Sequence, residues 1–200
     1  MTGAYASVNR PKGNAMTWMT CAGIGVAALP FLWFAATFNR FIRGRNQVRE
    51  AWSGIDVQLK RRHDLAPRLV ECVKGYRDHE RGVLEKVSAA RSDALRAQGV
   101  AQVERTEAAL TNNLRDLLAV AEAYPDLKAS QTFQQLSQAL IELEDQLQYA
   151  RRYYNGAVRD FNTLVESFPA VLAARLAGFH AQPFFSIDNA VERQTPGVTL

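Results

Sequence analysis

The sequence predicts an all-α protein: a single N-terminal transmembrane helix followed by an up-and-down antiparallel bundle of three to four long helices. Residues 15–38 carry no charged side chain, which is typical of a membrane span. Beyond them, apolar residues recur at alternating spacings of three and four, the pattern of helices that pack side by side. Between Phe41 and Phe168 the only prolines are Pro67 and Pro125, and the alternation typical of strands is absent, so this stretch favours helices over a sheet.

The predicted span follows a short polar tail, residues 1–14. As a helix, the twenty-four residues from 15 to 38 would measure roughly 36 Å, against about 30 Å for the hydrocarbon core of a bilayer. Arg10 and Lys12 precede the span, and four arginines follow it: Arg40, Arg43, Arg45 and Arg49. Because basic residues favour the cytoplasmic side, we expect the N-terminus outside and the bundle in the cytoplasm.

These four arginines, the arginine collar, admit two interpretations. Basic helices neutralise the phosphates of nucleic acids, and a basic segment beside a membrane span faces anionic lipid headgroups. No nucleic-acid-binding motif accompanies the net charge of +4. We therefore expect membrane lipid, and no nucleic acid, to meet the collar.

The first helical stretch of the body runs from the collar to Gly99. Pro67 predicts a kink or a short break over residues 64–67, because proline removes a backbone donor and clashes with the preceding turn. Asp64 is then placed to cap the helix that follows. Gly99 predicts the end of the stretch, since glycine suits a helix stop. The heptad positions are Val48, Trp52, Ile55, Leu59, Arg62, Ala66, Leu69, Val73, Tyr76, Glu80, Val83, Val87, Ala90 and Ala94.

Two further helices complete a predicted bundle domain over residues 39–169. The first covers 100–123 and ends at Tyr124–Pro125–Asp126; its apolar face holds Val103, Leu110, Leu114, Leu117 and Ala121. The second is the most regular and ends near Pro169; its apolar positions are Phe133, Leu136, Leu140, Leu143, Leu147, Ala150, Tyr154, Ala157, Phe161, Leu164 and Phe168.

The last predicted region, residues 170–200, changes character because glycine and proline become frequent. Its apolar side chains Phe179, Phe184 and Phe185 predict a segment that docks on the bundle. The final ten residues predict a loose tail.

Known catalytic and metal-binding patterns are absent from the sequence. His79–Glu80 begins like a zinc-protease motif, but Val83 stands where the second histidine would be required. No glutamate lies three residues before any histidine, which argues against a di-iron bundle. Glu142 and Glu144 are interpreted as a solvated face or as interhelical pairing. We expect no catalytic residue, no cofactor and no metal.

Two charged residues, Arg62 and Glu80, interrupt the heptad positions. They lie eighteen residues apart, roughly 27 Å along a straight helix, so they cannot pair with each other. A buried charge needs a partner. We expect each to meet an opposite charge or a backbone group of a neighbouring helix, and a polar pocket for a ligand or peptide is the alternative.

A polar stripe formed by Arg152, Asn155, Arg159 and Asn162 lies beside the apolar face of the last helix. It is either a solvent-facing row or an interface complementary to acidic residues of the first helix, such as Asp64. Our hypothesis is that it packs against the turn at residues 59–65. Reversing the charge of Arg159 should then cost well over the ~0.5 kcal/mol typical of surface changes.

Several separated motifs resemble one family. The segment NQVREAWSGIDVQLKRRHDLAPRLVECVKGYRDHE (46–80) is similar to the signature block of LemA family membrane proteins, as are YPDLKAS (124–130), Phe133 with Leu136, and ARRYYNGAVRDFNTLVESFP (150–169). The resemblance runs in order from residue 38 to residue 179. It implies a bacterial envelope protein with an N-terminal span and a helical bundle, and it brings no established enzymatic activity.

The sequence departs from the family pattern at a few positions. Phe38 stands where a tyrosine is common, and Ala66 and Arg68 flank Pro67 where the family often has an aliphatic residue and an asparagine. These departures are small.

The leading functional hypothesis is a single-pass protein of the bacterial inner membrane that acts as a non-enzymatic scaffold or adaptor. Long heptad faces and an anchored geometry suit binding to other envelope proteins or self-association. The alternative is a membrane-surface module that responds to anionic lipid through the arginine collar, Phe41 and Ile42.

Overall fold

The computed structural model describes residues 14–74 and 81–185, with side chains from residue 28 onward except those of residues 81 and 122. The helices in these residues are α1 (Asn14–Lys74), α2 (Arg81–Arg96), α3 (Val100–Glu122), α4 (Pro125–Ala129), α5 (Gln131–Glu166) and α6 (Ala170–Ala177). No strand occurs in the described ranges, so the all-α prediction is confirmed.

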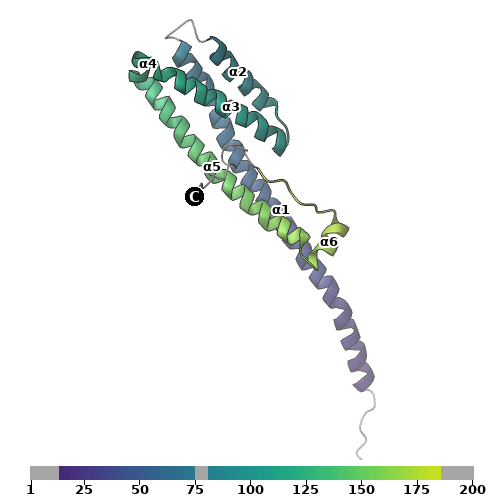
Figure 1. Cartoon of the computed structure of the whole chain (residues 1–200). Helices are drawn as coiled ribbons and strands as arrows, with labels where there is room; N and C mark the ends of the chain where they lie inside the picture. The colour runs from purple at the N-terminus through teal and green to yellow at the C-terminus, as the bar shows by residue number, and fades with distance from the viewer. Residues whose placement is uncertain (1–13, 75–80, 186–200) are drawn as a thin grey trace, which may run out of the picture.

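The long helices form two antiparallel pairs (Figure 1). α1 packs extensively along α5, and α2 packs on α3 against the part of α1 farthest from its N-terminus. α4 is a short helix with Pro125 in its first turn, where the missing N–H costs no helical hydrogen bond. Chain direction alternates along α1, α2, α3 and α5, which confirms the up-and-down bundle, and α1 extends beyond the bundle at its N-terminal end.

The apolar core divides into two clusters. One lies toward the N-terminal end of α1 and includes Phe41, Ile55 and Phe161; the other includes Leu69 and residues of α2, α3 and α4. The predicted heptad positions from Val48 to Val73 are buried or half-buried, as are the described ones of α2. The predicted positions of α5 from Phe133 to Leu164 are also buried or half-buried. Heptad spacing therefore predicted the core of the α1–α5 pair correctly, except at Phe168.

Gly44 allows α1 and α5 to approach closely. A Cβ atom at this position would lie 2.9 Å from Cδ2 of Phe161, closer than carbon atoms pack. A Cβ atom added to Gly54, which also lies on α1, would have no packing neighbour within 4 Å. The absence of a side chain is thus required by packing at Gly44 and not by contacts at Gly54.

Of the two predicted alternatives at Pro67, a kink or a short break, the break is wrong. α1 continues through Pro67 to Lys74, so Asp64 lies inside the helix, exposed, and does not cap a new one. One lost backbone hydrogen bond is offset by the buried contacts of Ala66 and Leu69 on either side of the proline.

The helix ends nearer the C-terminus follow the predictions closely. α2 ends at Arg96, and Gly99 adopts a φ of 75° before α3 begins. α3 covers the predicted 100–123 to within one residue, and α5 ends three residues before Pro169. Phe168, predicted as the last position of the apolar face of α5, instead lies beyond the helix and is 82% exposed.

The C-terminal region docks on the bundle as far as residue 185. Gly178 ends α6 with a φ of 71°, and the chain then runs back along the bundle as a strap, residues 178–185 (Figure 1). Phe179 packs on Phe41 with ring centroids 5.0 Å apart, and Phe185 packs on Trp52 at 5.7 Å. Phe184, the third predicted docking residue, is 48% exposed.

The predicted membrane span falls partly outside the described side chains. α1 includes residues 15–38 in its helical backbone, but side chains are described only from residue 28. Among the described residues, no helix offers an apolar stretch long enough to cross a membrane. Of the predicted tail, residues 1–14, only Asn14 is described, and it is helical. Residues 1–13 and 186–200 lie outside the described residues.

Candidate functional site

A layer of charged side chains separates the two core clusters, with Arg62 of α1 at its centre. Its Nη2 donates to Glu107 Oε2 at 2.5 Å, and its Nη1 donates to Glu144 Oε1 and Thr111 Oγ1, each at 2.6 Å. Arg62 is fully buried, and the Glu107 side chain is 1% exposed. The partners come from α3 and α5, so this arginine joins three helices, as the interhelical interpretation of Arg62 predicts.

His63 extends the charged layer to α2. Its Nε2 lies 2.6 Å from Glu107 Oε1, so both carboxylate oxygens of Glu107 have strong partners. Arg91 of α2 donates from Nε to the backbone carbonyl of His63 at 2.6 Å. All four long helices therefore contribute to one polar network, which sets their relative register.

Arg151 of α5 is the least compensated member of the layer. Burial lowers its pKa to about 10, repulsion from Arg62 acts in the same direction, and the glutamates around it, including Glu104, oppose both. Its Nε and Nη2 atoms are buried without a hydrogen-bond partner among the described residues. The guanidinium lies 5.4 Å from the ring centroid of Phe185, and this cation–π contact offsets part of the lost hydration.

The side chains of the charged layer bond mainly to one another. A small cavity of about 160 Å³ adjoins Glu107 and His63, with Trp52 and Lys60 among its other lining residues. The carboxylate of Glu107 that faces it is already engaged on both oxygens. The described residues contain no group of three or more side chains suited to a metal ion. The geometry gives the layer a structural role.

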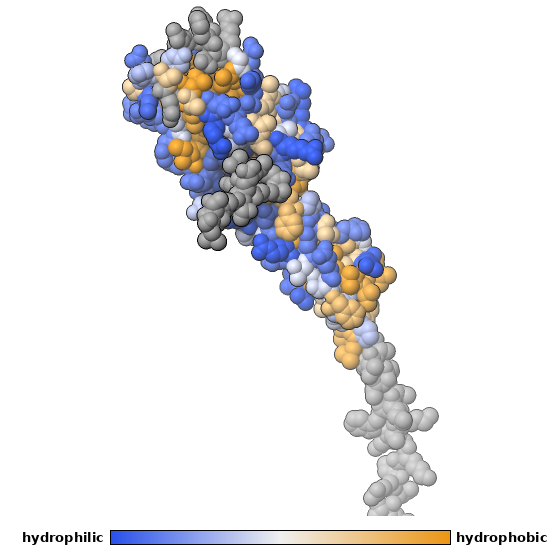
Figure 2. Space-filling view, in the orientation of Figure 1, coloured by the Kyte–Doolittle hydropathy of each residue, from blue (hydrophilic) through white to orange (hydrophobic). Residues whose placement is uncertain are grey.

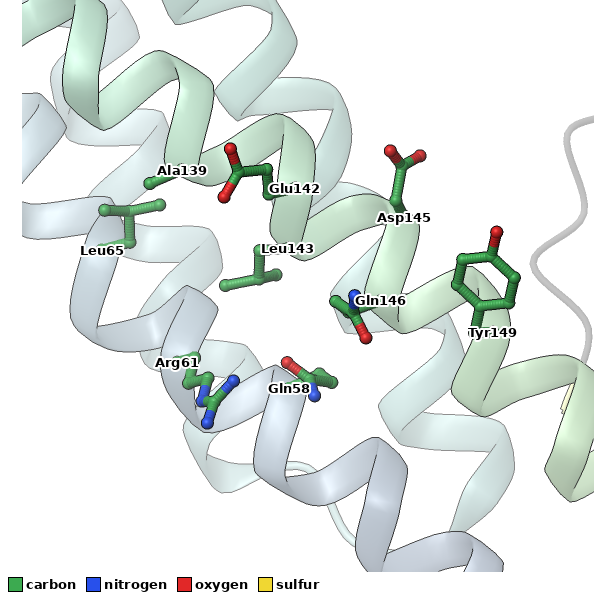
Figure 3. Close-up of a pocket in the computed structure, with 9 residues that line it drawn as sticks. All are labelled: Gln58, Arg61, Leu65, Ala139, Glu142, Leu143, Asp145, Gln146 and Tyr149. Carbon is green, nitrogen blue, oxygen red and sulfur yellow. The ribbon is translucent and has the colours of Figure 1, made fainter.

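An open groove of about 670 Å³ lies between α1 and α5 (Figure 3). Arg61 lines it from α1, and Glu142 and Asp145 line it from α5, so its walls carry opposite charges. None of the three forms an ion pair among the described residues. The Oε1 atom of Gln58 is buried there without a hydrogen-bond partner, and Tyr149 stands at the edge, 61% exposed. Glu142 Oε1 accepts a hydrogen bond from Gln138 Nε2 at 3.1 Å. The groove is thus a polar surface whose charged side chains form no ion pair among the described residues and whose Gln58 oxygen lacks a donor.

The arginine collar lies where α1 enters the bundle. Arg40, Arg43 and Arg49 are exposed, whereas Arg45 is half-buried with its guanidinium 5.4 Å from the ring centroid of Phe179. Arg40 and Arg43 line a surface hollow of about 390 Å³. Three of the four predicted collar residues are accessible.

Phe41 does not face the membrane surface, contrary to the lipid hypothesis. It is fully buried against Phe179, and Ile42 is half-buried. A lipid-responsive surface at this level must therefore use other side chains.

The predicted polar stripe on α5 does not pack against residues 59–65. Asn155 donates to the carbonyl oxygen of Phe185 and accepts from its N–H, both at 2.9 Å, and Asn162 does the same for Gln182 at 2.9 and 2.7 Å. Arg152 and Arg159 are exposed, the former 4.6 Å from the Tyr149 ring centroid. The asparagines thus bind the strap, which lies between them and solvent, and charge reversal at Arg159 should be nearly neutral.

Sequence reasoning missed several members of the charged layer: His63, Glu107, Thr111 and Arg151. A signal existed for two of them. Glu107 lies between Val103 and Leu110, and Arg151 between Leu147 and Tyr154, at the heptad spacings of four and three. Glu142 and Glu144 were predicted to form a solvated face or interhelical pairs. Glu144 makes an interhelical contact, with Arg62, and Glu142 is exposed. Glu80 lies outside the described residues.

Comparisons with known proteins identify related chains. The family model described as LemA family matches residues 51–200. Protein LemA of Metamycoplasma hominis is 28% identical over 135 residues, which cover 65% of this chain and 60% of that relative. The match therefore spans less than two thirds of that relative's own length.

Two magnetosome proteins show more distant similarity over more of the chain. Magnetosome protein MamQ 2 of Paramagnetospirillum magneticum is 22% identical over 204 aligned positions, covering 87% of this chain and 74% of the relative. Magnetosome protein MamQ of Magnetospirillum gryphiswaldense is 19% identical over 192 positions, covering 81% and 71%. The aligned regions thus extend beyond the charged layer to most of the bundle.

Proposed function

Because this chain belongs to the LemA family, we propose that it is a membrane-anchored, non-enzymatic scaffold or adaptor for other envelope proteins. The observation that carries this proposal is the groove between α1 and α5 (Figure 3). Its unpaired charges of both signs suit a protein surface of complementary charge, because such pairs determine which partner binds and in which orientation. The charged layer supports the same role, since the ion pair between Arg62 and Glu144 joins α1 to α5 and favours one register of the two groove walls.

Membrane anchoring is the second part of the proposal. The charge-free residues 15–38 are continuous in one helix with the groove wall, because α1 runs from Asn14 to Lys74. Leu29, Phe31 and Leu32 are 61–73% exposed on the part of α1 beyond the bundle, as lipid-facing side chains would be. We propose that this segment spans the bacterial inner membrane, with the N-terminus outside and the bundle in the cytoplasm.

Site-specific photocrosslinking tests the scaffold role. A photoreactive residue replaces Tyr149 in the groove, and a matched variant carries it at Lys86, an exposed position of α2. In native membranes we expect discrete adducts from position 149 that disappear with Arg61→Glu and are absent from position 86. An adduct at twice the mass of the chain would identify self-association as the scaffold's mode. Equal, diffuse labelling from both positions would contradict the proposal.

Cysteine accessibility tests the topology. A single cysteine replaces Gln98, between α2 and α3, in a variant whose Cys21 and Cys72 are replaced by serine. We expect a membrane-impermeant maleimide to label it only after permeabilisation. Labelling of intact cells would place the bundle outside and redirect the partner search to that side.

A second candidate function is a response to anionic lipid, favoured by the hollow that Arg40 and Arg43 line. Anionic headgroups should protect this region from hydrogen exchange in nanodiscs, and added salt should weaken the protection. The same chain in neutral lipid is the control. Identical exchange in both lipids would remove this candidate.

A further inference from the structure

Helix α6 presents its large apolar residues to the outside of the molecule. Its inner face consists of Ala170, Ala173 and Ala174, which are buried. Leu172 and Leu176 point away from the bundle and are 54% and 82% exposed. In a helix that covers a core in water, the larger residues would be expected on the buried face.

Phe168 extends this exposed row. It lies in the turn between α5 and α6, two residues before α6 begins, and it is 82% exposed. The three side chains, the α6 patch, lie on a short amphipathic segment whose outward face also carries the exposed Arg175. A patch of large apolar residues beside a cation is typical of a helix that lies in a membrane interface.

The fold prevents α6 from rotating its leucines inward. Gly178 turns the chain sharply after the helix, with a φ of 71° that other residues adopt only with strain. Phe179 is then buried, and Asn162 binds both backbone groups of Gln182. Held at this end, α6 keeps its alanine face on the bundle and its leucine face outward.

The α6 patch lies at the level where the proposed span ends. Phe179, the residue after Gly178, packs on Phe38 with ring centroids 5.8 Å apart and on Phe41 at 5.0 Å. Phe38 is the last residue of the charge-free segment, and Arg40 begins the collar. Figure 2 shows hydrophobic side chains gathered at this end of the bundle, where α1 emerges from it beside α6.

From this geometry we propose that the α6 patch is a second membrane contact, in which Phe168, Leu172 and Leu176 enter the interfacial region of the bilayer that α1 spans. Arg175 lies at headgroup depth and favours phospholipid phosphates. This inference rests on the proposed anchoring of α1. Two contacts, a span and an interfacial helix, fix the tilt of the bundle, which a single span would leave free to swing.

Fluorescence quenching of the full chain in phospholipid nanodiscs tests this contact. A fluorophore is attached to a single cysteine that replaces Leu176, with Cys21 and Cys72 changed to serine. Leu95→Cys on α2, originally 55% exposed, is the matched control, and Phe31→Cys reports the anchor. Lipids carrying a spin label near the headgroup quench a membrane-inserted probe, and iodide quenches a probe in water.

We expect spin-labelled lipid to remove most of the fluorescence at positions 176 and 31 and iodide to have little effect there, with the reverse at position 95. Quenching by lipid at 31 but by iodide at 176 would overturn the α6 contact and leave the anchor intact. Quenching by iodide at both would overturn the anchor and the α6 contact together. A probe at 176 that neither quencher reaches would mean that protein covers the patch, which also refutes a lipid contact.

Discussion

Replacing Arg62 with methionine tests whether the charged layer stabilises the bundle. Methionine keeps most of the side-chain length and the helix propensity of arginine but removes all of its hydrogen bonds. Three partners lose a donor: Glu107, Glu144 and Thr111. Thr111 Oγ1 still donates to the carbonyl of Glu107 at 2.9 Å, so the main effect falls on the two carboxylates.

The expected cost follows from their burial. Glu144 is 30% exposed and regains hydration, so the loss of its ion pair with Arg62 contributes little to the destabilisation. Glu107 is 1% exposed and would keep only His63 as a close partner, which leaves a poorly compensated buried charge. Breaking a buried pair on one side destabilises a protein by about 3–5 kcal/mol, and we expect Arg62→Met to lie in this range. Adding Glu107→Leu removes the stranded charge and should restore a large part of the loss.

The assay is urea unfolding of the full chain in detergent micelles, followed by circular dichroism at 222 nm. Arg61→Met is the matched control, because the neighbouring Arg61 is exposed and its loss should change the free energy of unfolding by less than about 0.5 kcal/mol. The reasoning is refuted if the free energy of unfolding of Arg62→Met differs from that of the wild type by less than about 0.5 kcal/mol. It also fails if Glu107→Leu makes Arg62→Met less stable instead of rescuing it.

Three further predictions concern packing, the strap and pH. Gly44→Ala should destabilise the bundle by about 1–3 kcal/mol, because its new Cβ overpacks α1 against α5, whereas Gly54→Ala should stabilise it by about 0.5–1 kcal/mol in the same urea assay; equal effects would contradict the packing argument. Asn155→Ala removes both side-chain hydrogen bonds to the backbone of Phe185, so hydrogen exchange at that amide should rise sharply, and unchanged protection would show that packing alone holds the strap. Burial raises the pKa of Tyr154 above its usual 10.0. Above pH 10 the unfolded chain therefore releases this proton before the folded protein does, and the free energy of unfolding falls as the pH rises. Wild type should therefore lose more stability than Tyr154→Phe between pH 9 and pH 11, and parallel losses would argue against this assignment.

Much of the fold was predictable because helices follow local rules. Heptad spacing located the buried faces of α1 and α5. Gly99 located the end of α2, and Pro125 located the end of α3. Pro67 shows the limit of these rules. Local propensity predicts a break there, but the helix continues because the residues on both sides are buried against neighbouring helices.

The candidate site was less predictable, because its residues come together only in the tertiary structure. Arg62 could be recognised as an unusual charge at a heptad position, but its partners lie 45 and 82 residues away on other helices. Neighbouring Arg151 and Arg152 look alike in sequence, and only the rotation of α5 buries the first and exposes the second. The same holds for Asn155, whose partner is the strap and not α1.

The sequence by itself determined that the chain is helical, where most helices end, which faces are apolar, and that residues 15–38 carry no charge. These properties depend on residues a few positions apart, so period and turn chemistry are sufficient to predict them. Only the tertiary structure decided which charges pair, where the strap docks and why α6 faces outward with its leucines. These depend on which distant surfaces meet, and that choice is made by the packing of the whole bundle rather than by any local segment.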